Sequence, residues 1–159
     1  MRYFLDCEFN GYRGELISMA LVADDGAELY LARPRLRKLD PWVEKNVEPI
    51  VTLDDACPEV CEVFSSRIQA FLTGDPFPII IADWPDDIRY FCECLITGPG
   101  EMVKSGPVIQ FEVRRVDAYP SQLAGAVQHN ALWDARALRA LFIKPKGADR
   151  RLPPGVHCP

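Results

Sequence analysis

The sequence predicts a single α/β domain in which helices flank a mixed β-sheet. Strand-like runs come first, in an order typical of an antiparallel meander, and later strand-like runs alternate with helical patterns. The length of 159 residues suits one domain of ordinary size. We assign residues 1–143 to this domain, and 144–159, which are rich in proline, glycine and charge, to a loose C-terminal tail.

The first half of the domain is expected to begin with the meander. The apolar run YFLDCEF at 3–9 predicts a strand, and an Asp-Asp-Gly turn joins two further β-like runs within 15–32. A short helix is expected after Pro41. Residues 54–72 carry apolar side chains at helical spacing, which predicts a longer helix.

The second half is expected to alternate strands and helices. It has short apolar runs typical of strands at 77–83 and 107–113, and helical patterns at 88–96, 119–128 and 130–142. Gly98 and Pro99 should follow the end of the first of these helices. Asn130 is a suitable N-cap for the last one.

Composition limits the class of protein. No run approaches the roughly 20 apolar residues that span a bilayer, and the N-terminal residues lack the pattern of a secretory signal. We therefore expect a cytoplasmic protein with no membrane partner. The six cysteines match no zinc spacing, and His129 and His157 are the only histidines, so free thiols are the expected state.

The net charge of −5 argues against a protein that holds nucleic acid by bulk electrostatics. It does not exclude a nuclease, because active-site carboxylates contribute to that total. Basic residues also cluster locally, at 33–38, 114–115 and 144–151. Each cluster is interpreted as a solvated surface.

Two carboxylates stand out in the first strand. Asp6 and Glu8 are two positions apart, so they project from the same face, about 7 Å apart along the backbone. Two desolvated like charges on an apolar strand cost several kcal/mol, on the order of the penalty for any unpaired buried charge, unless a cation or a proton compensates. The pair therefore indicates a cation site.

A second set of chemical groups lies near the other end of the domain. In HNALWDARAL, His129 precedes the expected helix and Asp134 falls in its first turn or so. A further carboxylate lies at the turn ADWPDDIRYF, where Asp83, Asp86 and Asp87 are candidates. The chain thus carries acids and a histidine in the order Asp, Glu, Asp, His, Asp.

This order resembles the DEDDh group of 3′-to-5′ exonucleases, which have the ribonuclease H-like fold, and is most similar to the compact exoribonuclease-like members. DCEF resembles the first exonuclease motif, HNALWDARAL the third and DDIRYF, more weakly, the second. The second motif departs from the common pattern, in which an Asn and a hydrophobic residue precede the aspartate, because here Trp84, Pro85 and Asp86 precede Asp87. We favour Asp87 as its acid, then Asp83, with Asp86 as a cap of the helix.

The resemblance implies a two-metal phosphodiesterase. Two divalent ions, Mg²⁺ or Mn²⁺, would be held by Asp6, Glu8, Asp87 and Asp134, with Asp6 bridging both, and His129 would accept a proton from the attacking water. Phe9 and Asn10 would contact the terminal nucleotide, with the alternative for Phe9 that its ring packs in the core opposite the carboxylate face. The implied products are nucleoside 5′-monophosphates released from RNA 3′ ends, with RNA preferred over DNA, and a homodimer is expected by analogy.

Two alternatives stay open. One is a DNA-directed exonuclease or another metal phosphoesterase with the same metal site. The other is a catalytically idle ribonuclease H-like module that binds nucleic acid or a protein partner. The presence of every catalytic residue type argues against the idle module.

Overall fold

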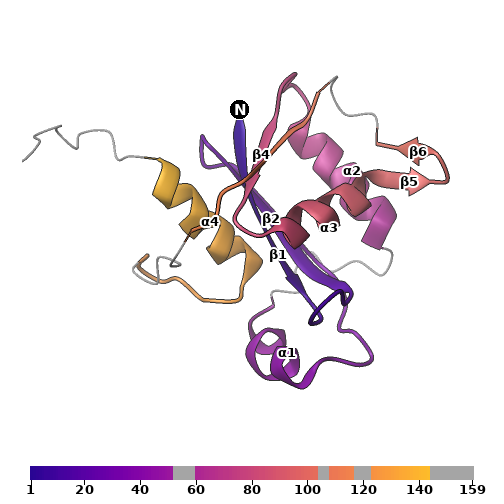
Figure 1. The fold of residues 1–159 in the computed structure, drawn as a ribbon, viewed down its shortest axis with the longest axis vertical. Coiled ribbons are helices and arrows are strands. Elements are labelled where there is room, and N and C mark those ends of the chain that lie inside the picture. Colours follow the sequence, from indigo (N-terminus) through magenta and orange to yellow (C-terminus); the bar gives the residue numbers. More distant parts are fainter. Residues whose placement is uncertain (52–59, 104–107, 117–122, 144–159) are drawn as a thin grey trace, which may run out of the picture.

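The computed structural model describes residues 1–51, 60–103, 108–116 and 123–143. Its centre is a five-stranded sheet in the order β3-β2-β1-β4-β7 (Figure 1). The strands are β1 (Arg2–Phe9), β2 (Leu16–Ala23), β3 (Glu28–Ala32), β4 (Ile79–Ala82) and β7 (Gln110–Val113). The first three form an antiparallel meander, whereas β1, β4 and β7 run parallel. The predicted mixed sheet is therefore confirmed.

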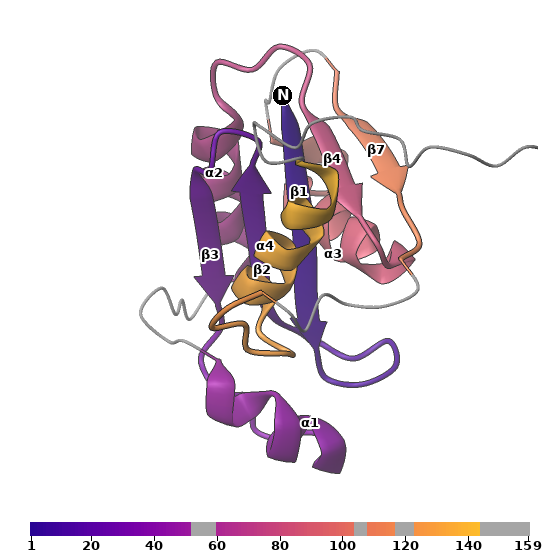
Figure 2. The same ribbon diagram turned by 90° about the vertical axis from the view of Figure 1, so that its left-hand side faces the viewer.

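Helices cover both faces of this sheet. The described α-helices are α1 (Pro41–Asn46), α2 (Val60–Leu72), α3 (Pro85–Leu95) and α4 (Ala131–Phe142). Helices α2 and α3 pack together on one face, and α4 crosses β1 and β2 on the other (Figures 1 and 2). Helix α1 lies below the sheet in Figure 2, beyond the end of β1 that carries Glu8 and Phe9. The α/β class with flanking helices is thus as the sequence predicts.

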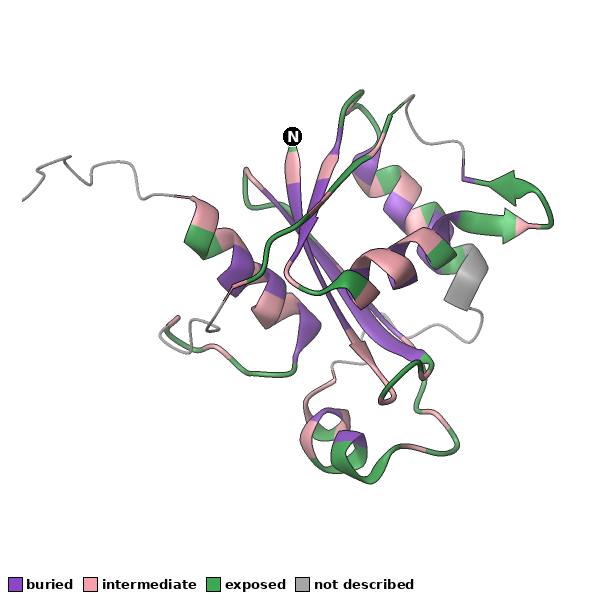
Figure 3. Ribbon diagram, in the orientation of Figure 1, coloured by how far each residue is buried: buried purple, intermediate pink, exposed green. Residues whose placement is uncertain are grey.

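The alternation of side chains along β1 determines which face receives the acid pair. Tyr3, Leu5 and Cys7 belong to the main core, which α2 and α3 cover. Phe4 points the other way and packs against Leu138 of α4. Asp6 and Glu8 continue the row that Phe4 begins, so both carboxylates lie on the α4 face. Figure 3 shows the sheet as the most deeply buried layer of the molecule.

Helix α4 is anchored at its first turn. The side chain of Asn130 accepts a hydrogen bond from the Trp133 amide at 3.3 Å, which confirms it as the N-cap. Its amide nitrogen also donates to the carbonyl of Ile50, in the 3₁₀ turn Glu48–Ile50. This second bond ties the start of α4 to the segment that follows α1.

The structure corrects several predicted elements. Helix α3 starts at Pro85, three residues before the predicted start, and ends at Leu95. Ile96 then begins a small hairpin that the sequence pattern does not indicate. Its strands are β5 (Ile96–Gly98) and β6 (Glu101–Met102). Residues 123–128 form turns rather than the predicted helix. The start of the predicted helix at 54, residues 117–122 and the tail 144–159 lie outside the described residues.

Two composition-based predictions bear on the described residues. Cys7, Cys92 and Cys94 are free thiols, of which Cys7 and Cys94 are buried. Among the described helices, none combines the length and the apolar character needed to cross a bilayer.

Candidate metal centre

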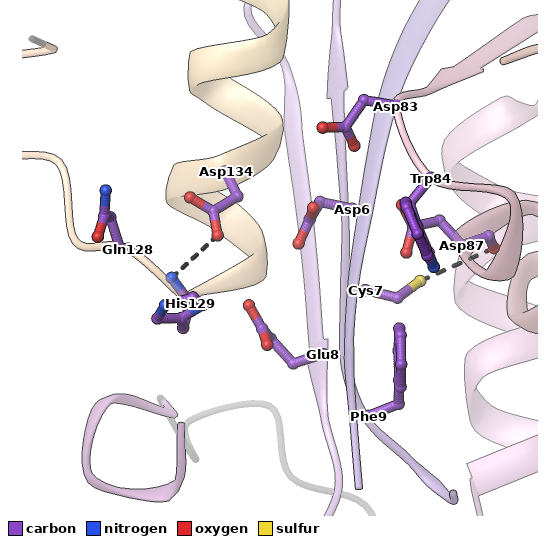
Figure 4. A pocket seen from close by; sticks show the side chains of 10 residues that line it. All are labelled: Asp6, Cys7, Glu8, Phe9, Asp83, Trp84, Asp87, Gln128, His129 and Asp134. Carbon is purple, nitrogen blue, oxygen red and sulfur yellow. Dashed lines mark hydrogen bonds between the residues drawn. The ribbon is translucent and has the colours of Figure 1, made fainter. Parts of the chain in front are cut away.

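A pocket of about 380 Å³ opens where β1, β4, α3 and α4 meet (Figure 4). Strand β1 contributes Asp6 and Glu8 to it. The remaining chemical groups come from the end of β4, the first turn of α3 and the start of α4, namely Asp83, Asp87, His129 and Asp134. The structure therefore brings together the acids and the histidine that the sequence singles out.

Asp6, Asp83 and Asp87 form the first of two ligand groups. Each offers an oxygen atom, and these atoms lie within 4.8 Å of one another. Asp83 reaches this position because β1 and β4 run parallel and Phe4 is paired with Ile81, so that the residue two positions after Ile81 is level with Asp6. Asp87 is 2% exposed, and its Oδ2 has no hydrogen-bond partner among the described residues. Such an orphaned buried oxygen is what a carboxylate arranged for a cation leaves when the cation is absent.

Asp86 is excluded from this group by its own contacts. Its carboxylate accepts hydrogen bonds from the Arg89 guanidinium at 3.0 Å and from the Trp84 indole at 3.2 Å. It does not cap α3 either, because the N-cap position is Trp84 and Asp86 lies inside the first turn. The suggestion that Asp86 caps the helix is therefore wrong. Asp87 and Asp83, the other two candidates, both line the pocket.

Glu8, His129 and Asp134 form the second ligand group, also with ligand atoms within 4.8 Å of one another. The backbone of His129 is left-handed, with φ of 62°, and its N–H donates to Asp134 Oδ2 at 3.0 Å (Figure 4). That conformation is uncommon for residues other than glycine and is found preferentially at functional sites. The Trp42 ring of α1 meets the imidazole edge-to-face at 4.9 Å between centroids. Asp134 thus fixes the backbone of His129, and Trp42 contacts its ring.

Burial makes these carboxylates hard to ionise without a cation. The pKa of Asp6 is raised well above its ordinary value, first by burial and then by the charges of Asp87 and Glu8. Burial followed by repulsion from Asp134 raises the pKa of Glu8 to about 8. Asp87 also reaches a pKa of about 8, through burial and then Asp83, although a backbone hydrogen bond from Cys7 lowers it in part.

Asp134 shows the same effect to a smaller extent. Burial raises its pKa to about 7, while the hydrogen bond from the His129 backbone opposes the rise. At neutral pH the pocket therefore either holds protons or needs an outside positive charge. Among the described residues, no lysine or arginine lines it.

The donor set fits a hard divalent cation. Two clusters dominated by carboxylate oxygens, each spanning less than 5 Å, suit Mg²⁺ or Mn²⁺, which prefer oxygen ligands. A bound cation would draw the ligand atoms of each cluster closer, to the roughly 3 Å separation of neighbouring ligands at octahedral bond lengths of about 2.1 Å. No family model and no curated protein matches this chain.

Of the two predicted substrate contacts, the structure brings one to the pocket. Phe9 lines it, but its ring lies on the opposite face of β1 from Glu8 and packs on Tyr90 at 5.0 Å between centroids. Asn10 is not among the lining residues. Its amide donates to the Lys38 carbonyl at 2.9 Å and accepts from the Asp40 amide at 2.7 Å, so it fastens the segment before α1.

Sequence reasoning assigned no role to three residues of this region. Trp84 and Gln128 line the pocket, and the indole of Trp84 is 47% exposed with the Arg115 guanidinium 5.4 Å from its ring centre. Their positions beside Asp83 and His129 in the chain were the available signal. Trp42 lies in DPWVEKNVEP, which also resembles a segment of the compact exoribonuclease-like members, but its contact with His129 is formed only when α1 folds back on the start of α4.

Proposed function

We propose that this protein is a metal-dependent 3′-to-5′ exoribonuclease with a ribonuclease H-like fold. The observation that supports it best is the convergence of five carboxylates and one histidine, from four separate segments, in a single pocket. The mixed sheet with helices on both faces is compatible with this fold. The 3′ polarity and the preference for RNA rest on the resemblance of DCEF, DDIRYF and HNALWDARAL to the exonuclease motifs.

The two ligand groups would hold two cations. Asp6, with Asp87 and Asp83, would hold one, and Glu8 and Asp134 the other. Bound there, divalent cations would activate a water molecule, offset the charge that grows on the phosphate and stabilise the departing oxygen. The high pKa values of Glu8 and Asp87 mean that cation binding releases protons from these carboxyl groups.

His129 would take the proton of the attacking water. It lies at the open side of the pocket, where Asp134 fixes its backbone and Trp42 limits rotation of its ring. A positioned base of this kind contributes on the order of 100- to 10,000-fold to the rate. Its closeness to Glu8 and Asp134 also makes it a potential cation ligand, and the variants described below separate these two roles.

The proposal is tested with 5′-labelled single-stranded RNA, the same RNA with a 3′-phosphate, and DNA of the same sequence. With Mg²⁺ or Mn²⁺ the RNA should give a ladder that shortens from the 3′ end, EDTA should stop it, and the 3′-phosphate should block it. Immediate release of a labelled mononucleotide, or internal cuts, would overturn the polarity. Faster loss of the DNA would overturn the RNA preference alone.

Matched variants connect the activity to the pocket. Asp6→Asn should lower turnover by more than about 100-fold, because it removes a charge from the first ligand group. Asp25→Asn, an exposed carboxylate in the turn between β2 and β3, should leave turnover unchanged. Equal activity in the Asp6 variant and the wild type would refute a metal centre in this pocket.

A further inference from the structure

A second hollow, the basic groove, lies beside the acidic pocket. Its volume is about 540 Å³, and its walls are the 10–16 segment after β1, the residue that follows β3 and one side of α3. Three arginines line it, Arg13, Arg33 and Arg89, together with two glutamates, Glu15 and Glu93. An adjoining depression is lined by Arg33, Arg35, Arg37 and Lys38, so the basic surface continues along the segment that leads to α1.

The groove and the acidic pocket share a wall. The Phe9 ring lines the pocket and packs on Tyr90, which lines the groove. Helix α3 likewise presents Asp87 to the pocket and Arg89 to the groove. A chain molecule whose end lies among the carboxylates and which leaves over Phe9 would therefore enter the basic groove directly.

The shared wall is rigidly built. The Tyr90 hydroxyl donates to the carbonyl of Gly14, which ties α3 to the 10–16 segment. Gly14 itself is required there, because a Cβ at this position would lie 1.8 Å from the carbonyl oxygen of Asn10. Arg13, next to it, also has a left-handed backbone, with φ of 57°. The segment is thus held in one compact shape beside the pocket.

Some of the basic side chains are already engaged by carboxylates. Arg89 pairs with Asp86 and Glu93. Arg35 is engaged in the same way, by Glu44 and Glu48, and Arg33 lies 3.7 Å from the Glu15 carboxylate. By contrast, Arg13, Arg37 and Lys38 are exposed and have no carboxylate partner within the described part of the chain. These three cations are the ones available to an anionic ligand.

We propose that the basic groove binds the phosphates of a single-stranded nucleic acid whose 3′ end lies in the acidic pocket. A repeating anion is the ligand that matches a row of cations, and this row is unusual in a chain of net charge −5. Tyr12, which is 84% exposed with the Arg13 guanidinium 5.2 Å from its ring centre, adds an aromatic face on which a base can stack. The groove would make the enzyme favour oligonucleotides over dinucleotides.

This inference rests on the proposed function for the place of the 3′ end, but binding is measured without catalysis. The probe is a fluorescent RNA of about eight nucleotides, a typical site size, titrated in EDTA by anisotropy. The double variant Arg13→Ala/Arg37→Ala should bind the RNA about tenfold more weakly. The slope of the logarithm of the binding constant against the logarithm of the salt concentration should become shallower by about 0.7 for each lost phosphate contact. Arg2→Ala removes a half-exposed charge at the other end of β1 and should bind as the wild type does.

The outcomes separate the groove from the catalytic proposal. Unchanged RNA affinity in the double variant, an equal loss in Arg2→Ala, or equally tight binding of an acidic peptide of the same charge would each overturn the groove. In Mg²⁺, the double variant should have a higher KM for the octanucleotide and the same dinucleotide turnover as the wild type. A fall in dinucleotide turnover as large as the fall for the octanucleotide would also contradict the groove proposal. A wild type that cleaves nothing but binds RNA through these arginines would refute the nuclease and leave the groove standing.

Discussion

Asp6 and Asp87 are buried carboxylates whose oxygens lie close to a third acid, Asp83. A protein that arranged such groups for stability alone would place a lysine, an arginine or hydrogen-bond donors around them. Instead, one oxygen of Asp87 has no hydrogen-bond partner among the described residues. At the scale of the residue, this arrangement lowers the stability of the metal-free protein, and it supports the proposal that the pocket holds a cation.

The three candidate acids Asp83, Asp86 and Asp87 should differ clearly in the effect of substitution. Asp87→Asn should lower turnover by more than about 100-fold, because Asp87 is the most buried of the three and carries the orphaned oxygen. Asp83→Asn should cost less, about 10- to 100-fold, since Asp83 is half-buried at the pocket rim. Asp86→Asn serves as the matched control and should stay near wild-type turnover. Normal activity in Asp87→Asn would show that this assignment is wrong.

Variants of His129 distinguish a base from a cation ligand. Because its backbone is left-handed, His129→Asn and His129→Gly keep that conformation with less strain than alanine would. Both should lower turnover by about 100- to 10,000-fold while the affinity for Mn²⁺, measured by calorimetry, stays close to that of the wild type. A parallel loss of Mn²⁺ affinity would make His129 a ligand.

At the scale of the element, the predictable parts are those whose signal is local. The strand at 3–9 with its acid pair and the helix that Asn130 caps follow from alternation, apolar spacing and capping chemistry. The same alternation places Phe9 opposite Glu8, so its packing on Tyr90 was foreseeable. The start of α3 was missed because the run Trp84–Asp87 was interpreted as a turn. Pro85 was nevertheless an available signal, since proline is favoured at the first position of a helix.

Other features depend on contacts that no local pattern carries. The β5–β6 hairpin covers few apolar positions, with Ile96 and Met102 both exposed, and so has no strand-like alternation. Asp83 joins the pocket only through the parallel register of β1 and β4. Asn10 is used to hold Lys38 and Asp40, residues about 30 positions away. A sequence can supply the groups of such a site without showing which of them meet.

Helix α1 acts on the site through Trp42, and this gives an element-scale prediction. Trp42→Ala should lower kcat up to about tenfold with little change in KM, because an edge-to-face pair contributes roughly 0.5–1.5 kcal/mol to holding the imidazole. Trp42→Phe keeps an aromatic partner and should recover most of the rate. The measurement is a kcat and KM comparison of the two variants, with thermal melts to confirm the fold. A loss confined to KM would assign Trp42 to substrate contact instead.

At the scale of the whole molecule, the pocket couples stability to pH. Glu8 and Asp87 have folded-state pKa values of about 8 and Asp134 of about 7, all above the values of about 4 for exposed carboxyl groups. Raised pKa values stabilise the folded protein below about pH 4, and that contribution is lost as the pH rises through the folded values. The metal-free protein should therefore become less stable as the pH rises from about pH 4 to about pH 8.

Thermal melts in EDTA across that range test the coupling. The melting temperature should fall as the pH rises, and Mg²⁺ or Mn²⁺ should raise it most at the alkaline end, where the carboxylates are ionised. Asp6→Asn, which removes one of the repelling charges, should reduce the fall, whereas Asp25→Asn should not. A metal-free melting temperature that rises over this range would contradict the raised pKa values.

The two ligand groups join segments that are far apart in the chain, because β1 lies at its beginning and α4 is its last described helix. A cation between Glu8 and Asp134 would act as a reversible cross-link that closes almost the whole described chain into a loop. Closing a long loop stabilises mainly by restricting the unfolded chain, but a cation binds only once the fold has formed. It would therefore slow the separation of α4 from the sheet, and the exchange of amide hydrogens in that helix would report how often the site comes apart.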